Sequence, residues 1–249
     1  MSTLIIEDLV WPELAAEIQN VKLALVPVGS CEQHGPNTTF YTDSGRADAY
    51  CKRLAERLGN KVASFPVVNY GMSLHHMGFP GTVTLRVETY IALLKDIGLA
   101  ISKHGIPKII FLSGHGGNYH ACDCACTALK QDYGIEAYWS GIGSSIANGG
   151  FPATKTGKLF GHADEVETSS TMGLCPQYVR ENRVKGEVHD SMLTNRRFIT
   201  GGAAWDWKKD ASENGALGDA RLADPEIGRQ MTEQSLDYME KLIEEIIAR

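Results

Sequence analysis

Three potential metal ligands lie close together in the N-terminal part of the sequence. Glu32 and His34 follow an apolar run at residues 23–29, and Asp43 comes nine residues after His34. In an extended chain, side chains two residues apart point to the same side, so Glu32 and His34 would share one side of a strand end. Carboxylates and imidazoles are ligands for divalent ions such as zinc and manganese. These three residues therefore predict a metal centre.

More histidines follow later apolar segments, in loops that also contain glycine. His75 and His76 lie within residues 69–82, His115 lies between Gly114 and Gly116, and His162 comes shortly before an acidic stretch. In an open α/β sheet, ligands bind outside the carboxyl ends of the strands. A single histidine is more often structural than functional, but repeated placement at strand ends favours a metal or acid–base site.

The acidic stretch after His162 contains Asp164, Glu165 and Glu167. Acidic residues are favourable at the positive end of a helix, and this accounts for one of the three. A nearby cation would account for the other two. We therefore expect this segment to approach the metal centre.

Two other motifs have simpler interpretations. The glycine-rich turn at residues 114–118 lacks both the G-x-G-x-x-G spacing and a P-loop lysine, so its glycines are better explained by a close approach of His115 and Asn118 to metal and substrate. Cys122, Cys124 and Cys126 do not have zinc-site spacing. We expect these three cysteines to be small buried residues of a helix.

Composition narrows the class of protein. The chain has 249 residues, 43% of them hydrophobic, and a formal net charge of −6. It contains no basic block, no apolar stretch of about 18 residues and no basic N-terminal leader. We predict a cytoplasmic protein that acts on a small molecule and binds neither nucleic acid nor membrane.

Apolar periodicity predicts a single α/β domain over residues 1–249, with a mostly parallel sheet and helices on both faces. The expected strands span residues 23–29, 61–68, 108–113 and 135–140. The expected helices span residues 1–20, 43–58, 87–104, 118–133, 164–174 and 225–248. Residues 181–224 have weak periodicity, and we expect them to pack over the site or against a partner.

Four sequence blocks together resemble the creatininase (creatinine amidohydrolase) family. They are Val-Pro-Val-Gly-Ser-Cys-Glu-Gln-His-Gly-Pro with a later Thr-Asp, Gly-Phe-Pro-Gly-Thr, Ser-Gly-His-Gly-Gly-Asn and Gly-His-Ala-Asp-Glu-Val-Glu-Thr-Ser, all within residues 26–170. The resemblance implies a creatininase-like fold with two divalent metal ions, usually zinc with manganese or iron. It also implies a homo-oligomer, often a hexamer.

The resemblance assigns metal-ligand roles residue by residue. It implies that Glu32, His34 and His115 are ligands and that Asp43 bridges both ions. Creatininase proper has a further glutamate ligand where this chain has Gly117. We predict that Glu165 replaces that glutamate, with Glu167 as the second choice.

This departure puts creatinine in doubt as the substrate. It favours relatives that deformylate pyrimidine intermediates, trim a mycofactocin precursor peptide or open a diketo-inositol ring. We expect a metal-dependent hydrolase that cleaves an amide C–N bond of a small cyclic or formamide-type substrate with metal-activated water. His162 or Glu165 would carry the proton, and His76, Asn118 and Tyr119 would bind the substrate.

Three alternatives remain open. One is the hydrolytic C–C ring opening of a diketo-inositol, as in 3-dehydro-scyllo-inosose hydrolase. The second is a metal-binding protein without catalytic activity. The third, a Rossmann-type oxidoreductase, would need a glycine fingerprint after the first long strand, where this chain has Glu32 and His34 instead.

Overall fold

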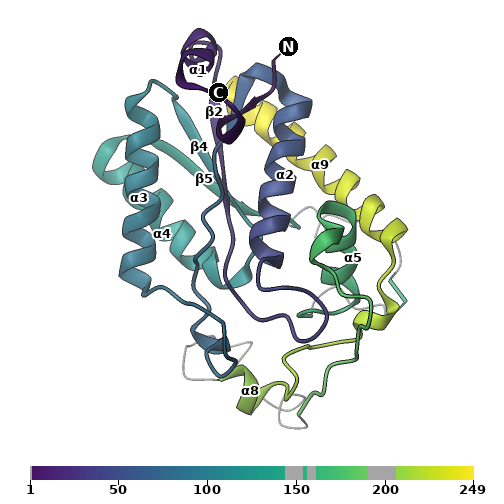
Figure 1. The fold of residues 1–249 in the computed structure, drawn as a ribbon. Helices are drawn as coiled ribbons and strands as arrows, with labels where there is room; N and C mark the ends of the chain where they lie inside the picture. Colours follow the sequence, from purple (N-terminus) through teal and green to yellow (C-terminus); the bar gives the residue numbers. More distant parts are fainter. Residues whose placement is uncertain (1, 144–153, 156–160, 190–205) are drawn as a thin grey trace.

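A parallel sheet between two layers of helices forms the centre of the computed structural model (Figure 1). The structure describes residues 2–143, 154–155, 161–189 and 206–249. Within them, the strands are β1 (Leu4–Ile5), β2 (Leu23–Val28), β3 (Val62–Ser64), β4 (Lys108–Ser113) and β5 (Glu136–Gly141). They pair in the order β1-β3-β2-β4-β5, and every pairing is parallel. The predicted fold class is confirmed.

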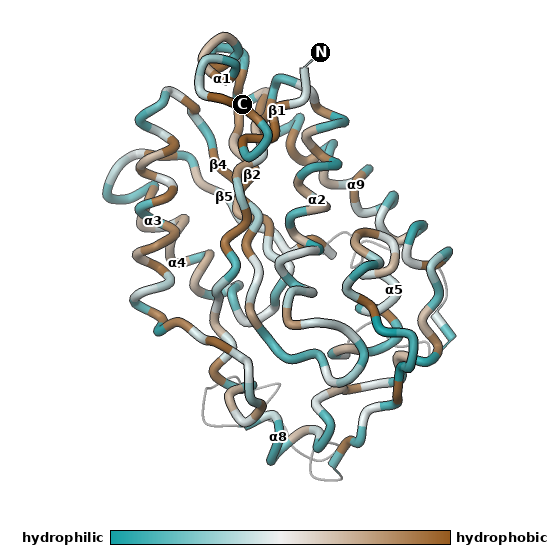
Figure 2. The backbone as a smooth tube through the Cα atoms, viewed as in Figure 1, coloured by the Kyte–Doolittle hydropathy of each residue, from teal (hydrophilic) through white to brown (hydrophobic). Residues whose placement is uncertain are grey.

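The two faces of the sheet bury alternate residues of the central strands. Ala24 and Val26 of β2 pack in the core beneath α3 (Val87–Lys103) and α4 (Tyr119–Tyr133). Leu23 and Leu25 of the same strand pack on the other face. That face is covered by the helices α2 (Thr42–Leu58), α5 (Glu165–Leu174) and α9 (Pro225–Ala248). Figure 2 shows brown, apolar segments along the central strands, as burial on both faces requires.

Most of the predicted elements are confirmed, including β4 and α9 with their predicted bounds. The predicted helix over residues 1–20 is wrong at its start, because Leu4 and Ile5 pair with β3 at the edge of the sheet. Within the described residues of this segment, the α-helix is limited to α1 (Trp11–Glu17), and a short 3-10 helix at Ile6–Asp8 precedes it. Strand pairing has outweighed the local helical pattern.

Strand β3 is shorter than predicted. It ends at Ser64, two residues before Pro66, which has no N–H to donate to a ladder. Pairing resumes only at an isolated bridge between Val28 and Val68. The chain is thereby free to leave the sheet and form the loop that carries His76.

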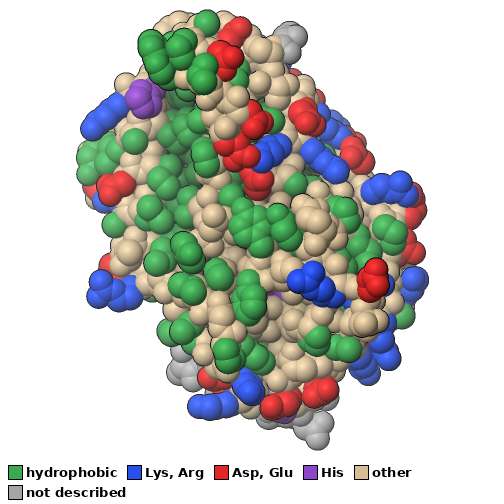
Figure 3. Space-filling model, viewed as in Figure 1, with side chains coloured by type: hydrophobic (Ala, Val, Ile, Leu, Met, Phe, Trp, Pro, Cys, Tyr) green, Lys and Arg blue, Asp and Glu red, His purple; other side chains and the backbone are tan. Residues whose placement is uncertain are grey.

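Two smaller expectations have mixed outcomes. Cys122 and Cys126 lie on the inner face of α4 and are buried in the core, as predicted, but Cys124 of the same helix is exposed and its prediction was wrong. No helix in the described part of the chain is long and apolar enough to cross a bilayer. Figure 3 shows acidic and basic side chains interspersed on the face in view, with apolar side chains between them.

Candidate metal centre

The carboxyl ends of β2 and β4 and the N-terminus of α2 meet at one edge of the sheet. Glu32 and His34 follow β2, His115 follows β4, and Asp43 lies in the first turn of α2. Close approach here requires Gly114, because a Cβ at this position would lie less than 3.0 Å from the carbonyl oxygen of Asp43. The helix start is therefore held directly against the strand ends.

One group of potential ligands consists of Glu32, Asp43 and His115. Each offers a ligand atom within 4.8 Å of the others. The Nδ1 atom of His115 lies 3.2 Å from Oδ2 of Asp43, and its Nε2 atom lies 3.4 Å from Oε2 of Glu32. All three side chains are buried.

A second group consists of His34, His162 and Glu167, again within 4.8 Å of one another. The Nε2 atom of His34 lies 3.6 Å from Oε2 of Glu167 and 3.3 Å from Oδ1 of Asp43. Asp43 thus presents one carboxylate oxygen to each group, which is the geometry expected of a bridging ligand.

Three buried atoms at the junction of the two groups fit divalent ions. Oε2 of Glu32, Nε2 of His34 and Oδ2 of Asp43 have no hydrogen-bond partner among the described residues. Buried polar atoms are normally satisfied, so each such atom calls for an explanation. Oxygen and imidazole nitrogen atoms that converge without hydrogen bonds are what a divalent ion requires.

Main-chain carbonyls fix the orientation of three histidine rings. Nδ1 of His34 donates to the Glu32 carbonyl at 3.0 Å, Nε2 of His115 to the Met72 carbonyl at 3.1 Å, and Nε2 of His162 to the Gln33 carbonyl at 2.7 Å. A carbonyl oxygen can only accept, so the other nitrogen of each neutral ring carries a lone pair. In each case this second nitrogen faces the carboxylates. Such outer hydrogen bonds are typical of metal-ligating histidines.

Electrostatics in the cluster favours a cation. Burial opposes charge on Asp43, but His34 and His115 outweigh it and hold the pKa of Asp43 below its usual range. Burial raises the pKa of Glu32 to about 7, against the opposing effect of His115. Burial also opposes protonation of His34, but Asp43 and Glu167 raise its pKa well above the usual value. In each case, carboxylates and imidazoles stabilise one another's charged forms.

The structure places Glu167, not Glu165, beside this cluster. Residues two apart on a helix point about 200° apart, so only one of the two can face the site. Glu165 is buried, and its Oε1 atom accepts a hydrogen bond from the amide of Lys155 at 2.6 Å. Glu167 receives one from Arg46 and another from the amide of Ala163, each at 2.7 Å. The geometry favours the second choice of the sequence analysis.

Position 117 could not supply this carboxylate in the observed structure. A Cβ on Gly117 would lie less than 3.0 Å from Nε2 of His115 and from the carbonyl oxygen of Met72. A side chain at this position would therefore displace the His115 ring. Glycine at position 117 leaves room for the His115 ring, and Glu167 of α5 supplies a carboxylate to the cluster instead.

Two predicted substrate-binding residues lie elsewhere. Asn118 is fully buried, and its side chain accepts from the Met72 amide and donates to the Gly29 carbonyl, both at 3.0 Å. It thus ties two strand-end loops together, a structural role. Tyr119 packs against Trp139, with 5.1 Å between ring centroids. Neither residue lines the cavity over the metal cluster that the described residues form.

That cavity has a volume of about 330 Å³. Besides the cluster residues Glu32, Asp43, His115, His162 and Glu167, it is lined by His75, His76, Gly114, Gly116, Gly117, Gly161 and Trp207. The position predicted for His76, at the substrate pocket, agrees with this lining.

Trp207 was not among the predicted site residues. Its ring stacks on His76, with centroids 4.3 Å apart, and meets His162 edge-on at 4.9 Å. The chain continues over the site, because Leu217 forms a main-chain bridge with His162. Part of the excursion predicted for residues 181–224 thus packs over the site, while residues 190–205, including Trp205, lie outside the described residues. The pair Trp205-Asp-Trp207 in a stretch without periodicity was the sequence signal.

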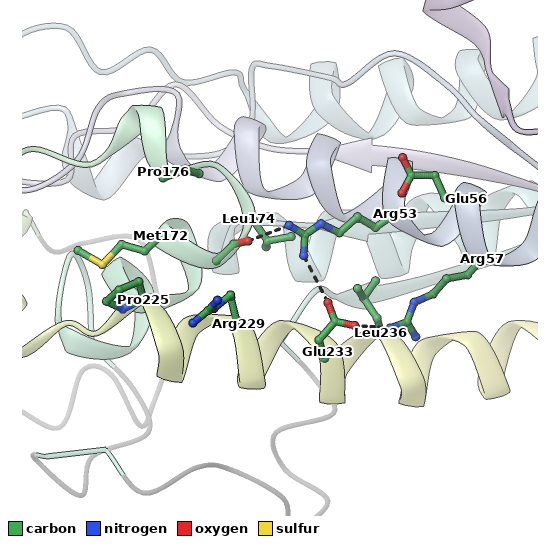
Figure 4. Close-up of a pocket in the computed structure, with 11 residues that line it drawn as sticks. Arg53, Glu56, Arg57, Met172, Leu174, Pro176, Pro225, Arg229, Glu233 and Leu236 are labelled. Carbon is green, nitrogen blue, oxygen red and sulfur yellow. Dashed lines mark hydrogen bonds and ion pairs between the residues drawn. The ribbon is translucent and has the colours of Figure 1, made fainter.

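A larger hollow of about 820 Å³ lies away from the cluster, between α2, α5 and α9 (Figure 4). Its arginines are already engaged. Arg53 donates to the Gly173 carbonyl at 2.9 Å and faces Glu233 at 3.6 Å, and Arg57 pairs with Glu233 at 2.5 Å. This hollow contains no residue of the metal cluster, so the smaller cavity is the better candidate for catalysis.

A family model, similar sequences and similar solved structures all point to one protein family. The family model described as "Creatininase: Creatinine amidohydrolase" matches residues 7–243. The mycofactocin precursor peptide peptidase of Mycolicibacterium smegmatis is 33% identical over 208 residues, which cover 82% of this chain and 76% of that protein. The 3-dehydro-scyllo-inosose hydrolase of Thermotoga maritima is 26% identical over 261 residues, covering 98% and 83% respectively.

Solved structures show the same fold. A manganese form of creatininase and a Zn–Zn form of a creatininase variant each have a TM-score of 0.82 and 23% identity, with complete coverage of both chains. At this level of identity, the likeness establishes the architecture of the chain.

Proposed function

Because the chain belongs to the creatininase family and is a hydrolase, we propose that it cleaves an amide C–N bond with water activated between two divalent metal ions. The substrate we propose is small and cyclic or of formamide type. The observation that supports this most directly is the convergence of three buried, unpartnered atoms from Glu32, His34 and Asp43.

The side chains divide into two ligand sets. Glu32, Asp43 and His115 would hold one ion. His34 and Glu167 of the second group, together with the other oxygen of Asp43, would hold the other ion, and His162 of that group would remain for proton transfer. Zinc and manganese, which occur in the similar creatininase structures, are the metals we propose. Bound divalent ions supply a Lewis acid for the substrate carbonyl and lower the pKa of water toward neutrality.

His162 is placed to handle the proton. Burial and the nearby His34 lower its pKa to about 4, so the ring is neutral near pH 7 and can accept a proton. Its Nε2 atom is held by the Gln33 carbonyl, and its Nδ1 atom lies 3.7 Å from Glu32 and 3.8 Å from Glu167. We assign His162 to take a proton from the attacking water and deliver it to the leaving nitrogen. Glu165, the other predicted proton carrier, lies outside this arrangement because it bonds the Lys155 amide.

Trp207 lines the cavity over the metal cluster. Its ring is 5% exposed and covers His76 and His162. Exclusion of bulk water strengthens the electrostatic interactions among charges within the cavity. We propose that Trp207 and His76 contact the substrate in place of Asn118 and Tyr119.

A second activity is supported by the Thermotoga maritima relative, whose alignment spans 98% of this chain. The same residues would serve hydrolytic C–C cleavage of a 1,3-diketone, because there too water attacks a carbonyl and a proton must reach the leaving group. A purely metal-binding protein would not need a neutral imidazole held ready to accept a proton.

The test is to measure metal content and turnover on one preparation. We expect two zinc or manganese ions per chain, loss of turnover with EDTA, and recovery when either ion is added back. The substrate panel should contain cyclic amides, N-formyl compounds, short peptides and a cyclic diketone. Hydrolysis of the diketone alone would favour the second activity, while bound metal without any turnover would favour the metal-binding alternative. Full activity in chelator would contradict a metal mechanism.

From the family resemblance, we also propose a homo-oligomer, most simply a hexamer. Apolar side chains near the site loops, such as Leu74 and Met77, are 58% and 49% exposed in the single chain. Sedimentation of the 27.2 kDa chain tests this directly, and a monomer at micromolar concentration would contradict it.

A further inference from the structure

Gln33 lies in sequence between Glu32 and His34, two proposed metal ligands. Its own side chain forms hydrogen bonds with main-chain groups of other loop residues. Its side-chain Oε1 atom accepts a hydrogen bond from the amide of Gly35 at 2.8 Å. Its Nε2 atom donates to the carbonyl of Gly215 at 3.2 Å. The same atom lies 3.1 Å from Nε2 of His162, but that nitrogen donates to the Gln33 carbonyl at 2.7 Å and so does not accept from the amide. Side-chain amides can be placed in two orientations, but a main-chain N–H can only donate and a carbonyl can only accept. These two contacts therefore settle which end of the Gln33 amide is nitrogen.

The settled amide determines the tautomer of His76. Nδ1 of His76 lies 2.7 Å from Nε2 of Gln33. Because the amide nitrogen is only a donor, Nδ1 of His76 must accept. The proton of the neutral ring is then on Nε2, which lies 3.3 Å from Oε1 of Glu32.

The neutral ring of His76 is thus oriented in the opposite way to the neighbouring histidine rings. His34, His115 and His162 each donate from one nitrogen to a main-chain carbonyl, so the lone pair of each neutral ring is on the nitrogen that faces the carboxylates. His76 turns an N–H toward them instead. By distance alone, Glu32, His76 and His162 could hold an ion, since their ligand atoms lie within 4.8 Å of one another. An ion bound at Nε2 would require the ring proton on Nδ1, where it would face the N–H of Gln33, so the Gln33 contact excludes that arrangement.

We propose that Gln33 is a positioning residue that holds His76 as the Nε2–H tautomer, which makes His76 a hydrogen-bond donor to Glu32 and excludes it from the metal-ligand set. One oxygen of Glu32 is then restrained by His76, and the other, which is unpartnered in the described structure, remains for the metal. This last step rests on the proposed metal centre, whereas the tautomer rests on the hydrogen bonds alone.

The same amide connects this tautomer to the covering segment. The carbonyl of Gly215 accepts from Nε2 of Gln33 and also from the indole Nε1 of Trp207, at 2.9 Å. Trp207 in turn stacks on the ring of His76. Gln33 therefore holds the ring from its edge while Trp207 holds its face, and both depend on one carbonyl group.

The test is to locate the imidazole protons by ¹⁵N NMR of protein labelled at histidine, both metal-free and loaded with zinc. We expect His76 to be protonated at Nε2 only, in both states. His189 is an internal reference, because its Nε2 atom donates to the Lys208 carbonyl at 2.9 Å and must give the same signature. Protonation of His76 at Nδ1 in the unaltered protein would overturn the proposal without any variant.

The variant Gln33→Glu replaces the donor by an acceptor of the same size. We expect the His76 proton to move to Nδ1 and the zinc affinity to fall about 10- to 100-fold, the usual range for lost outer hydrogen bonds to ligands. Gln230→Glu makes the same chemical change on the exposed surface of α9 and should alter neither signal. Retention of the Nε2–H signature in Gln33→Glu would overturn the proposal. Failure of the unaltered protein to bind zinc would instead contradict the proposed metal centre, and the metal-free spectrum would still decide the tautomer.

Discussion

Arg46 donates a hydrogen bond from Nη1 to Oε1 of Glu167, with 2.7 Å between the two atoms. The pair joins the N-terminal halves of α2 and α5, and the two residues are 121 positions apart in sequence. It restrains one oxygen of Glu167, while the other accepts from the Ala163 amide at 2.7 Å and lies 3.6 Å from Nε2 of His34. Burial opposes charge on Glu167, but His34 and Arg46 hold its pKa well below the usual range. Glu167 is therefore an ionised carboxylate, as the proposed ligand role requires.

The first prediction separates the two glutamates of α5. Glu167→Gln should reduce the metal content from two ions per chain to one, because an amide is a much weaker ligand than a carboxylate. Glu165→Gln is the matched control and should keep both ions, since Glu165 bonds the Lys155 amide instead. Elemental analysis of the dialysed variants decides between them. Loss of an ion from the Glu165 variant alone would restore Glu165 as the ligand.

The second prediction concerns the bridging carboxylate. Asp43→Ala should lose both ions, because Oδ1 of Asp43 faces His34 and Oδ2 faces His115. Asp48→Ala, in the same helix, removes a carboxylate that pairs with Lys52 and should keep both ions. Metal content and circular dichroism should be measured together, so that loss of metal is not confused with loss of fold. A folded Asp43 variant with two ions would contradict the bridging assignment.

The third prediction uses two adjacent glycines. Gly117→Ala should destabilise the chain by about 1–3 kcal/mol, the usual cost of overpacking, because the new Cβ would collide with the His115 ring and the Met72 carbonyl. Gly116→Ala should change stability by less than about 0.5 kcal/mol, since a Cβ there would meet nothing within 4 Å. Urea unfolding of the metal-free proteins measures both free energies. Equal effects would show that His115 can move away at little cost.

The fourth prediction concerns pH. Burial opposes protonation of His115, but Glu32 and Asp43 raise its pKa to about 9, and burial raises the pKa of Glu32 to about 7. The metal-free cluster therefore holds protons at neutral pH that an incoming ion must displace. Zinc affinity should rise with pH from 6 to about 9 and then level off. Titration against a chelator, corrected for its own protonation, measures this, and an affinity independent of pH would contradict the ligand set.

The sequence by itself was enough to predict much of the architecture and part of the site. Strand β4 and helix α9 carry their own periodicity and boundary residues, so local pattern determines their limits. Glu32, His34 and His115 follow strands directly, and the carboxyl ends of parallel strands necessarily meet at one edge of the sheet. Their convergence with Asp43 was therefore predictable.

Tertiary structure alone decided the rest. Whether Glu165 or Glu167 faces the cluster depends on the rotation of α5 about its axis, which is set by its packing on α9 and α2 rather than by its own residues. The structural role of Asn118 and the covering role of Trp207 depend on contacts with Gly29 and His76, which lie far away in sequence. Strand β1 forms only because β3 provides an edge for it. In each case, the deciding interaction joins segments that no local pattern connects.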